Sequence, residues 1–152
     1  MDKNYNELEI LLVEDNMSDA ELILRALRKV NLANNVVHLR DGAEAIEFLT
    51  GAGEYADRNV KKIPKVVLLD IKMPRVDGIE VLKQIKENEE TKLIPVVVMT
   101  SSKEEQDIIK SYELGVNSFM SKPVDFNNFA RAVSKLGLYW VLINQSPLYL
   151  NK

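Results

Sequence analysis

The sequence predicts an α/β protein in which five short strands alternate with five helices around a doubly wound, parallel sheet. Two observations support this fold class. Short apolar or β-branched runs recur along the 152 residues, and each is followed by a segment whose apolar residues have helical spacing. The first three runs are apolar almost throughout, which is typical of strands covered by helices on both faces. Parallel strands also require crossover connections, and the intervening helices can supply them.

The first half of the chain contains two of these strand–helix pairs. Residues 8–13 form an apolar run that ends in acidic residues, and Ser18 or Asp19 is expected to cap the helix that follows. Residues 36–39 come after an asparagine-rich turn and are expected to form the second strand. A helix opened by Asp41 follows it, and glycines end that helix.

The second half contains three further pairs. The polar segment 54–65 is expected to be a surface loop, longer than most connections in compact α/β units. Strands are then expected at residues 66–69, 94–99 and 117–121, each followed by a helix. Asp125 can cap the last helix. The apolar stripe of that helix is expected to contain Phe129, Val133, Leu136 and Trp140.

Length and composition limit the possible classes of protein. We expect a single domain over residues 1–152, with a core at about 7–136 and a C-terminal helix extension and tail at 137–152. The absence of cysteine excludes disulfides and thiolate metal sites, and a net charge of -3 does not favour binding to nucleic acid or to a membrane surface. The polar first residues are not a signal peptide, and no apolar run approaches the roughly 20 residues that cross a bilayer. A cytoplasmic protein is therefore expected.

Reactive side chains follow four of the five predicted strands. Glu14 and Asp15 follow the first strand, Asp70 the third, Thr100 the fourth and Lys122 the fifth. In open α/β sheets, ligands bind at the edge formed by the carboxyl ends of the strands. The strand order 2-1-3-4-5, known for one doubly wound type, makes the first and third strands neighbours. With that order, the acidic residues should lie close together.

This set of residues suggests phosphoryl chemistry assisted by a metal. Three carboxylates in one pocket repel one another, and a hard cation with oxygen ligands would relieve that repulsion. Mg²⁺ is the expected ion, with Mn²⁺ as the alternative. Asp70 can attack phosphorus, Lys122 can neutralise phosphoryl oxygens, and Thr100 can donate a hydrogen bond to one of them. Taken singly, the acids could be helix caps or turn residues, Thr100 a cap, and Lys122 a solvated lysine. Their joint position favours a site.

Four segments of the sequence carry a family resemblance, and they are residues 10–16, 67–78, 95–101 and 119–123. Through them the chain resembles response-regulator receiver domains over nearly its whole length. The resemblance implies the flavodoxin-like receiver fold with strand order 2-1-3-4-5. It also implies that Asp70 is the phosphoacceptor, that Glu14, Asp15, Asp70 and the Lys72 backbone carbonyl bind the metal, and that Thr100 and Phe119 form a switch pair.

Further segments are similar to those of the small single-domain regulators paired with bacterial and cyanobacterial phytochromes. These segments are the loop 54–65 and residues 107–114, 117–119, 122–125 and 139–140. This second resemblance implies a sensor histidine kinase partner of the bacteriophytochrome kind. It also implies a homodimer formed through the fourth helix, fifth strand and fifth helix. Residues 137–152 are too few for a DNA-binding domain, so the expected output is protein–protein contact, phosphate relay or dimerisation, without direct DNA or membrane binding.

Three alternatives were weighed against this interpretation. The first is an intermediate phosphate-relay receiver that serves a kinase other than a phytochrome. The second is a haloacid-dehalogenase-like phosphatase, which needs a second Asp two positions after its nucleophile, where this chain has Lys72. The third is a nucleotide- or flavin-binding module, but the acidic segment 14–18 has no glycine with which to cradle a phosphate. We therefore expect a phosphoacceptor signalling domain, with only self-catalysed phosphotransfer and autodephosphorylation.

Overall fold

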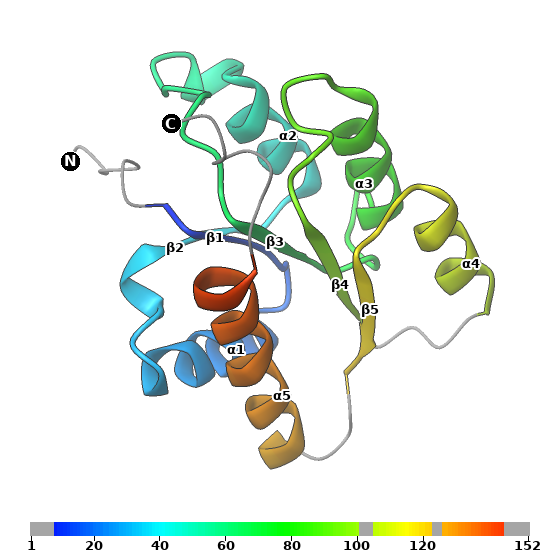
Figure 1. The fold of residues 1–152 in the computed structure, drawn as a ribbon. Helices are drawn as coiled ribbons and strands as arrows, with labels where there is room; N and C mark the ends of the chain where they lie inside the picture. The colour runs from blue at the N-terminus through cyan, green and yellow to red at the C-terminus, as the bar shows by residue number, and fades with distance from the viewer. Residues whose placement is uncertain (1–7, 101–104, 123–125, 145–152) are drawn as a thin grey trace.

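The computed structural model describes residues 8–100, 105–122 and 126–144, and it confirms the predicted alternation of five strands and five helices (Figure 1). The sheet is parallel throughout, and its order is β2-β1-β3-β4-β5, as predicted. Its strands are β1 (Ile10–Val13), β2 (Val36–Leu39), β3 (Val66–Leu69), β4 (Val96–Thr100) and β5 (Ser118–Ser121). The helices are α1 (Met17–Lys29), α2 (Gly42–Thr50), α3 (Gly78–Glu87), α4 (Glu105–Glu113) and α5 (Phe126–Leu138).

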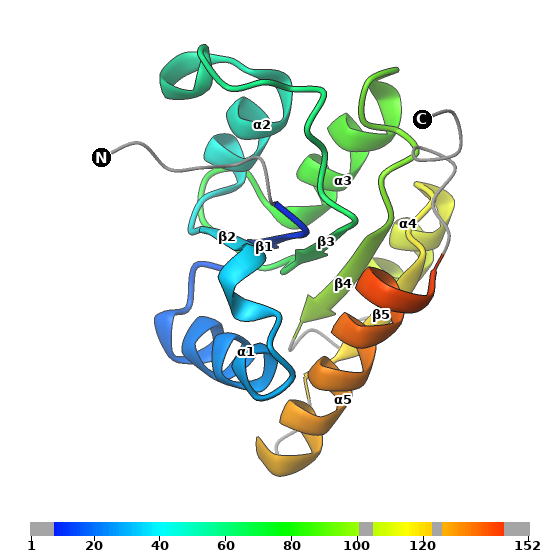
Figure 2. The ribbon, with the colours of Figure 1, turned by 60° about the vertical axis from the view of Figure 1, so that its left-hand side comes forward.

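Helices cover both faces of the sheet. α1 and α5 lie side by side on one face, and α2 and α3 lie on the other, with α4 beside α3 (Figures 1 and 2). Strand residues alternate between two apolar clusters, because successive side chains of a strand point to opposite faces. In β1, for example, Ile10 and Leu12 pack towards α1 and α5, whereas Leu11 and Val13 pack towards α2 and α3. Both faces are therefore buried, as the apolar runs indicated.

The strand register brings the polar residues to one edge. Val13 at the end of β1 is paired with Leu39 of β2 and with Leu69 of β3. The pairing continues one step further, because the Asp70 amide donates to the Val13 carbonyl at 3.0 Å and the Glu14 amide donates to the Leu39 carbonyl at 3.0 Å. The residues after β1 and β3 therefore leave the sheet next to each other.

Two helix caps test the sequence interpretation. The prediction that Ser18 or Asp19 caps the first helix is wrong, because α1 begins earlier and Asn16 is its N-cap, with its side chain accepting the Asp19 amide at 3.0 Å. Asp41 caps α2 as predicted, and its carboxylate accepts the Ala43 amide at 2.7 Å. The predicted cap Asp125 lies outside the described residues.

Three strands begin later than expected, and the smallest shift is that of β5, which begins at Ser118 rather than at Asn117. β1 begins at Ile10 rather than at Leu8, which is buried but lies outside the ladder. β4 begins at Val96 rather than at Ile94, because Pro95 has no amide hydrogen to donate and contributes only its carbonyl, which accepts the Val67 amide at 2.9 Å.

Arg58 organises the long loop before β3. Its Nε donates to the Phe48 carbonyl at 2.6 Å, and its Nη1 donates to the Lys62 carbonyl at 2.9 Å. The guanidinium also lies over the Phe48 ring, 4.1 Å from the ring centroid. The loop leads into the amino end of β3, so it lies at the edge of the sheet opposite to the acidic residues.

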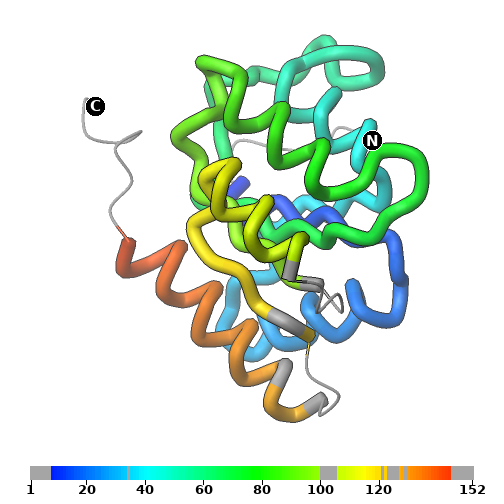
Figure 3. The backbone as a smooth tube through the Cα atoms, turned by 90° about the vertical axis from the view of Figure 1, so that its right-hand side faces the viewer, coloured from blue at the N-terminus to red at the C-terminus, as the bar shows by residue number. Residues whose placement is uncertain are grey.

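The C-terminal helix changes character after Leu138. A π-helical turn (Tyr139–Ile143) continues the path of α5 (Figure 3), so Trp140 belongs to this turn and not to α5 itself. Trp140 nevertheless packs against the apolar cluster between the sheet and α1, as the predicted stripe required. The Lys65 ammonium fixes the turn by donating to the Val141 carbonyl at 3.3 Å. No helix in the described ranges is both long enough and apolar enough to cross a membrane.

Candidate functional site

An acidic cluster lies at the carboxyl edge of the sheet, where the sequence predicted it. Glu14, Asp15 and Asp70 each offer a carboxylate oxygen, and these oxygens lie within 4.8 Å of one another. Glu14 is only 1% exposed and Asp70 only 7%, while Asp15 is half-buried. Carboxylates this deeply buried are costly unless a cation compensates their charge.

A tight turn after β3 packs against the backbone of Asp70. The Gly78 amide donates to the Ile71 carbonyl at 2.8 Å, so the chain folds back under the end of β3. A Cβ atom at Gly78 would collide with the Asp70 carbonyl oxygen and would lie 2.6 Å from the Ile71 Cα. Only glycine fits at this position. Asp77 then caps α3 by accepting the Glu80 amide at 3.0 Å, which fixes where the turn ends.

Lys122 points into the acidic cluster. Its ammonium pairs with Glu14, lies 2.8 Å from Asp19 Oδ2, and lies 3.5 Å from Asp70 Oδ2. The Lys122 side chain is 9% exposed. The alternative interpretation of Lys122 as a solvated surface lysine is therefore wrong.

Asp19 is the member of this arrangement that sequence analysis missed as a site residue. The sequence suggested a helix cap, but the side chain turns from the first turn of α1 towards Lys122. One signal could have identified it: Asp19 is an acidic residue at the start of the predicted helix, only four residues after Asp15.

Burial and charge shift two of the titrating groups. The pKa of Glu14 is raised to about 8; burial is the main cause and the adjacent Asp70 adds to it, while Lys122 acts in the opposite direction. Burial alone would lower the pKa of Lys122. The hydrogen bonds to Asp19 and Glu14, together with the charges of Glu14 and Asp70, outweigh that effect and leave the pKa above its usual value. Both groups therefore hold their protons more tightly than usual, which shows that the site favours a bound proton or cation.

The donor atoms fit a divalent metal ion. Asp70 Oδ1 is buried and has no hydrogen-bond partner, so it is an acceptor without a donor to satisfy it. The neighbouring ligand atoms are all carboxylate oxygens, the ligands that hard divalent cations prefer. The predicted metal ligands Glu14, Asp15 and Asp70 are thus brought together.

The other predicted residues lie on neighbouring elements. Thr100 is the last residue of β4 and pairs with Ser121, directly before Lys122, but its side chain lies outside what the structure describes. Phe119 is half-buried and packs against the apolar cluster on the α2–α3 face, opposite Val98. These positions place the predicted switch residues on adjacent strands.

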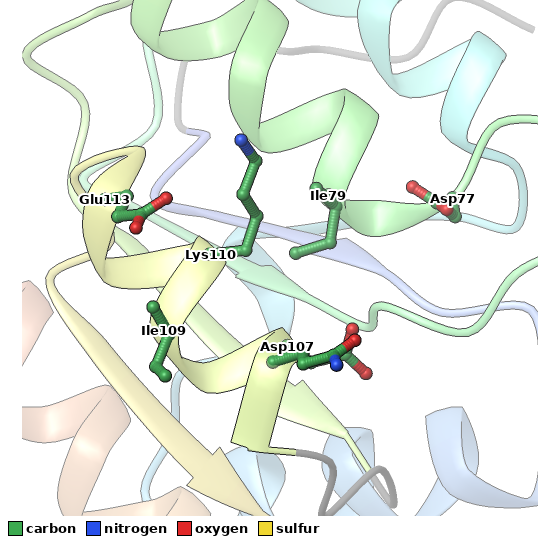
Figure 4. Close-up of a pocket in the computed structure, with 7 residues that line it drawn as sticks. Asp77, Ile79, Asp107, Ile109, Lys110 and Glu113 are labelled. Carbon is green, nitrogen blue, oxygen red and sulfur yellow. The ribbon is translucent and has the colours of Figure 1, made fainter.

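Lys72 connects the site to α4. Its ammonium lies 3.3 Å from Asp107 Oδ2, so the side chain points away from the acidic cluster. Asp107 also lines an open groove of about 470 Å³ between α3 and α4, which Ile79 lines from α3 and Lys110 lines from α4 (Figure 4). None of the residues that line the groove belongs to the acidic cluster, so the two features are separate.

Comparison with known proteins identifies the family. The profile of the response regulator receiver domain matches residues 10–134, and the chain belongs to that family. Among curated relatives, it is 41% identical over 141 residues to the probable methanogenesis regulatory protein FilR2 of Methanothrix harundinacea, covering 91% of this chain and 86% of that protein. It is 39% identical over 132 residues to the response regulator Rcp1 of Synechocystis sp., covering 87% of this chain and 88% of Rcp1.

Solved structures agree with this assignment. The phosphorylated cyanobacterial phytochrome response regulator RcpA superposes with a TM-score of 0.85 at 38% identity, covering 92% of this chain and 98% of RcpA. The Mn²⁺-bound form of Rcp1 gives 0.84 at 38% identity, covering 92% and 99%. The bacteriophytochrome response regulator AtBRR gives 0.69 at 53% identity, covering 91% and 99%. The chain is thus a receiver domain of the two-component type, a signalling protein rather than a metabolic enzyme.

Proposed function

We propose that this receiver acts as a single-domain response regulator, with residues 1–152 as one domain, and that Asp70 accepts a phosphoryl group from a histidine kinase. The observation that carries the proposal is the buried Asp70 carboxylate, whose Oδ1 lacks a partner while Lys122 lies beside its Oδ2. A carboxylate with one free oxygen beside a cation can act as a nucleophile towards phosphorus. The high coverage of RcpA and AtBRR supports a regulator of this size.

The proposed step is a transfer between two nucleophiles. An Asp70 oxygen attacks the phosphorus of a phosphohistidine, an O–P bond forms, the N–P bond breaks, and the histidine nitrogen keeps the electron pair. Lys122 stabilises the negative charge on the phosphoryl oxygens during the transfer. In autodephosphorylation, water attacks phosphorus, the bond to Asp70 breaks, and the carboxylate and free phosphate are formed.

We propose Mg²⁺ as the physiological ion, with Mn²⁺ as a substitute. Glu14, Asp15 and Asp70 would hold it, as their converging carboxylates suggest. The Lys72 backbone carbonyl is proposed as a fourth ligand from the family resemblance, and the Lys72 ammonium, which pairs with Asp107, is not part of the site. When bound, the ion would supply further neutralisation of phosphoryl charge. The Mn²⁺-bound form of Rcp1 supports a divalent ion of this kind.

We propose that phosphorylation changes the conformation of the domain through Thr100 and Phe119. Thr100 would donate a hydrogen bond to the phosphoryl group, and the half-buried Phe119 ring would turn further inward behind it. The signal would then reach the surface formed by α4, β5 and α5, where a homodimer would form. Exposed apolar residues of α4, Ile109 and Tyr112, support this location. We propose a cytoplasmic location and no direct contact with DNA or membrane.

A bacteriophytochrome is the proposed kinase, because AtBRR, at 53% identity, is a bacteriophytochrome response regulator. The similarity to FilR2 supports one alternative, a kinase with another signal or a relay role. Phosphotransfer from purified kinases of both classes distinguishes them: the proposal expects transfer from the bacteriophytochrome at a rate at least tenfold higher. Equal or lower transfer would favour the alternative. The phosphatase alternative has no support, because Lys72 occupies the position of the required acid.

Incubation with acetyl phosphate and Mg²⁺, followed by intact mass spectrometry, tests the function itself. We expect one added phosphoryl group in the parent protein and none in Asp70→Asn. Asp57→Asn, a change at an exposed residue of the long loop, should be labelled like the parent. Labelling of Asp70→Asn to the same extent as the parent would overturn the assignment.

A further inference from the structure

The Lys122 ammonium has three acidic neighbours, and one of them is not a predicted metal ligand. Of the three carboxylates around its ammonium, Glu14 and Asp70 belong to the acidic cluster, whereas Asp19 lies outside it on α1. The ammonium is 2.8 Å from Asp19 Oδ2 but 3.5 Å from Asp70 Oδ2. The ammonium therefore lies between Glu14 and Asp19, its two nearest carboxylates, and makes only a longer contact with Asp70.

The position of Asp19 is fixed by local structure. Asn16 caps α1, and its side chain accepts the Asp19 amide at 3.0 Å, which places Asp19 in the first helical turn. An acidic side chain is favoured there by the partial positive charge of the helix N-terminus. Asp19 is 32% exposed, so holding its charge costs less desolvation than holding that of the buried Glu14. Asp19 is thus a stable anchor for an ammonium group.

A lysine in full contact with Asp70 would hinder the chemistry. An ammonium ion close to both oxygens would compete with a metal for them and would reduce the nucleophilicity of the carboxylate. Asp70 Oδ1 instead remains without a partner. Because Glu14 and Asp19 hold the ammonium most closely, it contacts only Oδ2 of Asp70 and leaves Oδ1 without a hydrogen-bond partner.

We propose that Asp19 is a positioning residue that holds the Lys122 ammonium on the α1 side of the pocket and so keeps the Asp70 carboxylate open to metal and phosphoryl donor. This inference rests on the proposed function, but it adds a residue that the family comparison does not assign. Asp19 acts through Lys122, so its effect must disappear when Lys122 has no charge.

A double-mutant cycle tests the inference through Mn²⁺ affinity, with free Mn²⁺ counted by electron paramagnetic resonance. In the parent background, Asp19→Asn should weaken Mn²⁺ binding roughly three- to tenfold, the range expected for coupled neighbours. In the Lys122→Met background, the same change should alter the affinity by less than about twofold. Glu21→Gln is the matched control: Glu21 lies on the same helix but pairs with Arg28 at 3.3 Å, and the affinity should stay that of the parent.

Two results of the double-mutant cycle would overturn the inference that Asp19 positions Lys122. An equal loss in both backgrounds would show that Asp19 acts only as a bulk negative charge, and no loss in the parent background would remove its role; either result overturns the inference. Asp19→Ser, measured in the same cycle, replaces Asp19→Asn if circular dichroism shows that the latter is unfolded. Failure of the parent protein to bind Mn²⁺, or unchanged binding in Asp15→Asn, would instead count against the proposed function.

Discussion

Gly78 packs directly against the backbone of Asp70, so the first turn of α3 touches the residue that follows β3. A methyl group at Gly78 would meet backbone atoms, which cannot move aside without shifting the loop. We predict that Gly78→Ala lowers the free energy of unfolding by about 2–3 kcal/mol, as overpacking at rigid sites does. Urea unfolding measures this loss.

Gly137→Ala is the matched control for this prediction. A Cβ atom at Gly137 would meet Leu27 Cδ2 at 2.8 Å, but that atom is the end of a flexible side chain. The helix propensity of alanine, better than that of glycine by about 1 kcal/mol, should offset part of the cost. The loss should therefore stay below about 1 kcal/mol. Equal losses for the two variants would show that the turn beneath Asp70 is not rigid.

The pKa of Glu14 predicts how stability depends on pH. The pKa rises from an ordinary value of 4.5 to about 8 in the folded protein, mainly because Glu14 is buried. The folded state therefore favours protonated Glu14, and this contribution to stability is complete below pH 4.5 and lost as the pH rises through about 8. In EDTA, the melting temperature of the parent should fall over this range relative to that of Glu14→Gln.

Metal should reverse this trend, because carboxylates bind metal in the deprotonated form. Stabilisation of the parent by Mg²⁺ should increase between pH 5 and pH 8, and Glu14→Gln should lose most of it. Thermal unfolding by differential scanning calorimetry measures both effects, with the exposed change Glu21→Gln as the control. Parallel curves for the parent and Glu14→Gln in EDTA would contradict the assigned pKa.

Arg58 should contribute to stability without contributing to function. Its planar guanidinium donates to several carbonyls and stacks on Phe48, and lysine cannot reproduce this geometry. We predict that Arg58→Lys lowers the free energy of unfolding by about 1–3 kcal/mol, while labelling by acetyl phosphate stays at the parent level. A loss of labelling in a folded Arg58→Lys protein would show that the long loop communicates with Asp70.

The proposed dimer surface can be separated from the C-terminal turn. Ile109 on α4 is 50% exposed, and Leu142 in the π-helical turn is 68% exposed. If the dimer forms through α4, β5 and α5, Ile109→Lys should weaken dimerisation at least tenfold, by roughly the 1.4 kcal/mol or more that a buried interface residue contributes. Leu142→Lys should leave it unchanged. Analytical ultracentrifugation of protein with and without beryllofluoride gives the answer, and the reverse pattern would move the interface to the turn.

Much of the fold could be predicted because the pattern was local. Each predicted strand begins and ends within two residues of an observed one. The short apolar runs around Leu11 and Leu68 indicated buried strands, and both residues are fully buried. The gathering of Glu14, Asp15 and Asp70 followed from strand order and from the rule that ligands bind at the carboxyl edge. Strand order was itself taken from a known fold type rather than from the residues.

The role of Asp19 could not be predicted because it depends on tertiary geometry. Asn16, Ser18 and Asp19 are all suitable helix caps, and only the path of the chain out of β1 decides which one accepts the backbone amide. Once Asn16 takes that place, Asp19 is free to face Lys122, which is 103 residues further along the chain. Trp140 was likewise assigned to the last helix by its spacing, but a π-helical turn carries it.

The central claim, that Asp70 receives the phosphoryl group, is tested most directly by chemical mapping of the acyl phosphate. After incubation with acetyl phosphate and Mg²⁺, borohydride reduces a phosphorylated aspartate to homoserine, and tandem mass spectrometry locates it in the chain. The account predicts homoserine at position 70 and at no other aspartate, with the yield abolished by EDTA. Homoserine at Asp15 or Asp19, or none at position 70 in phosphorylated protein, would contradict it.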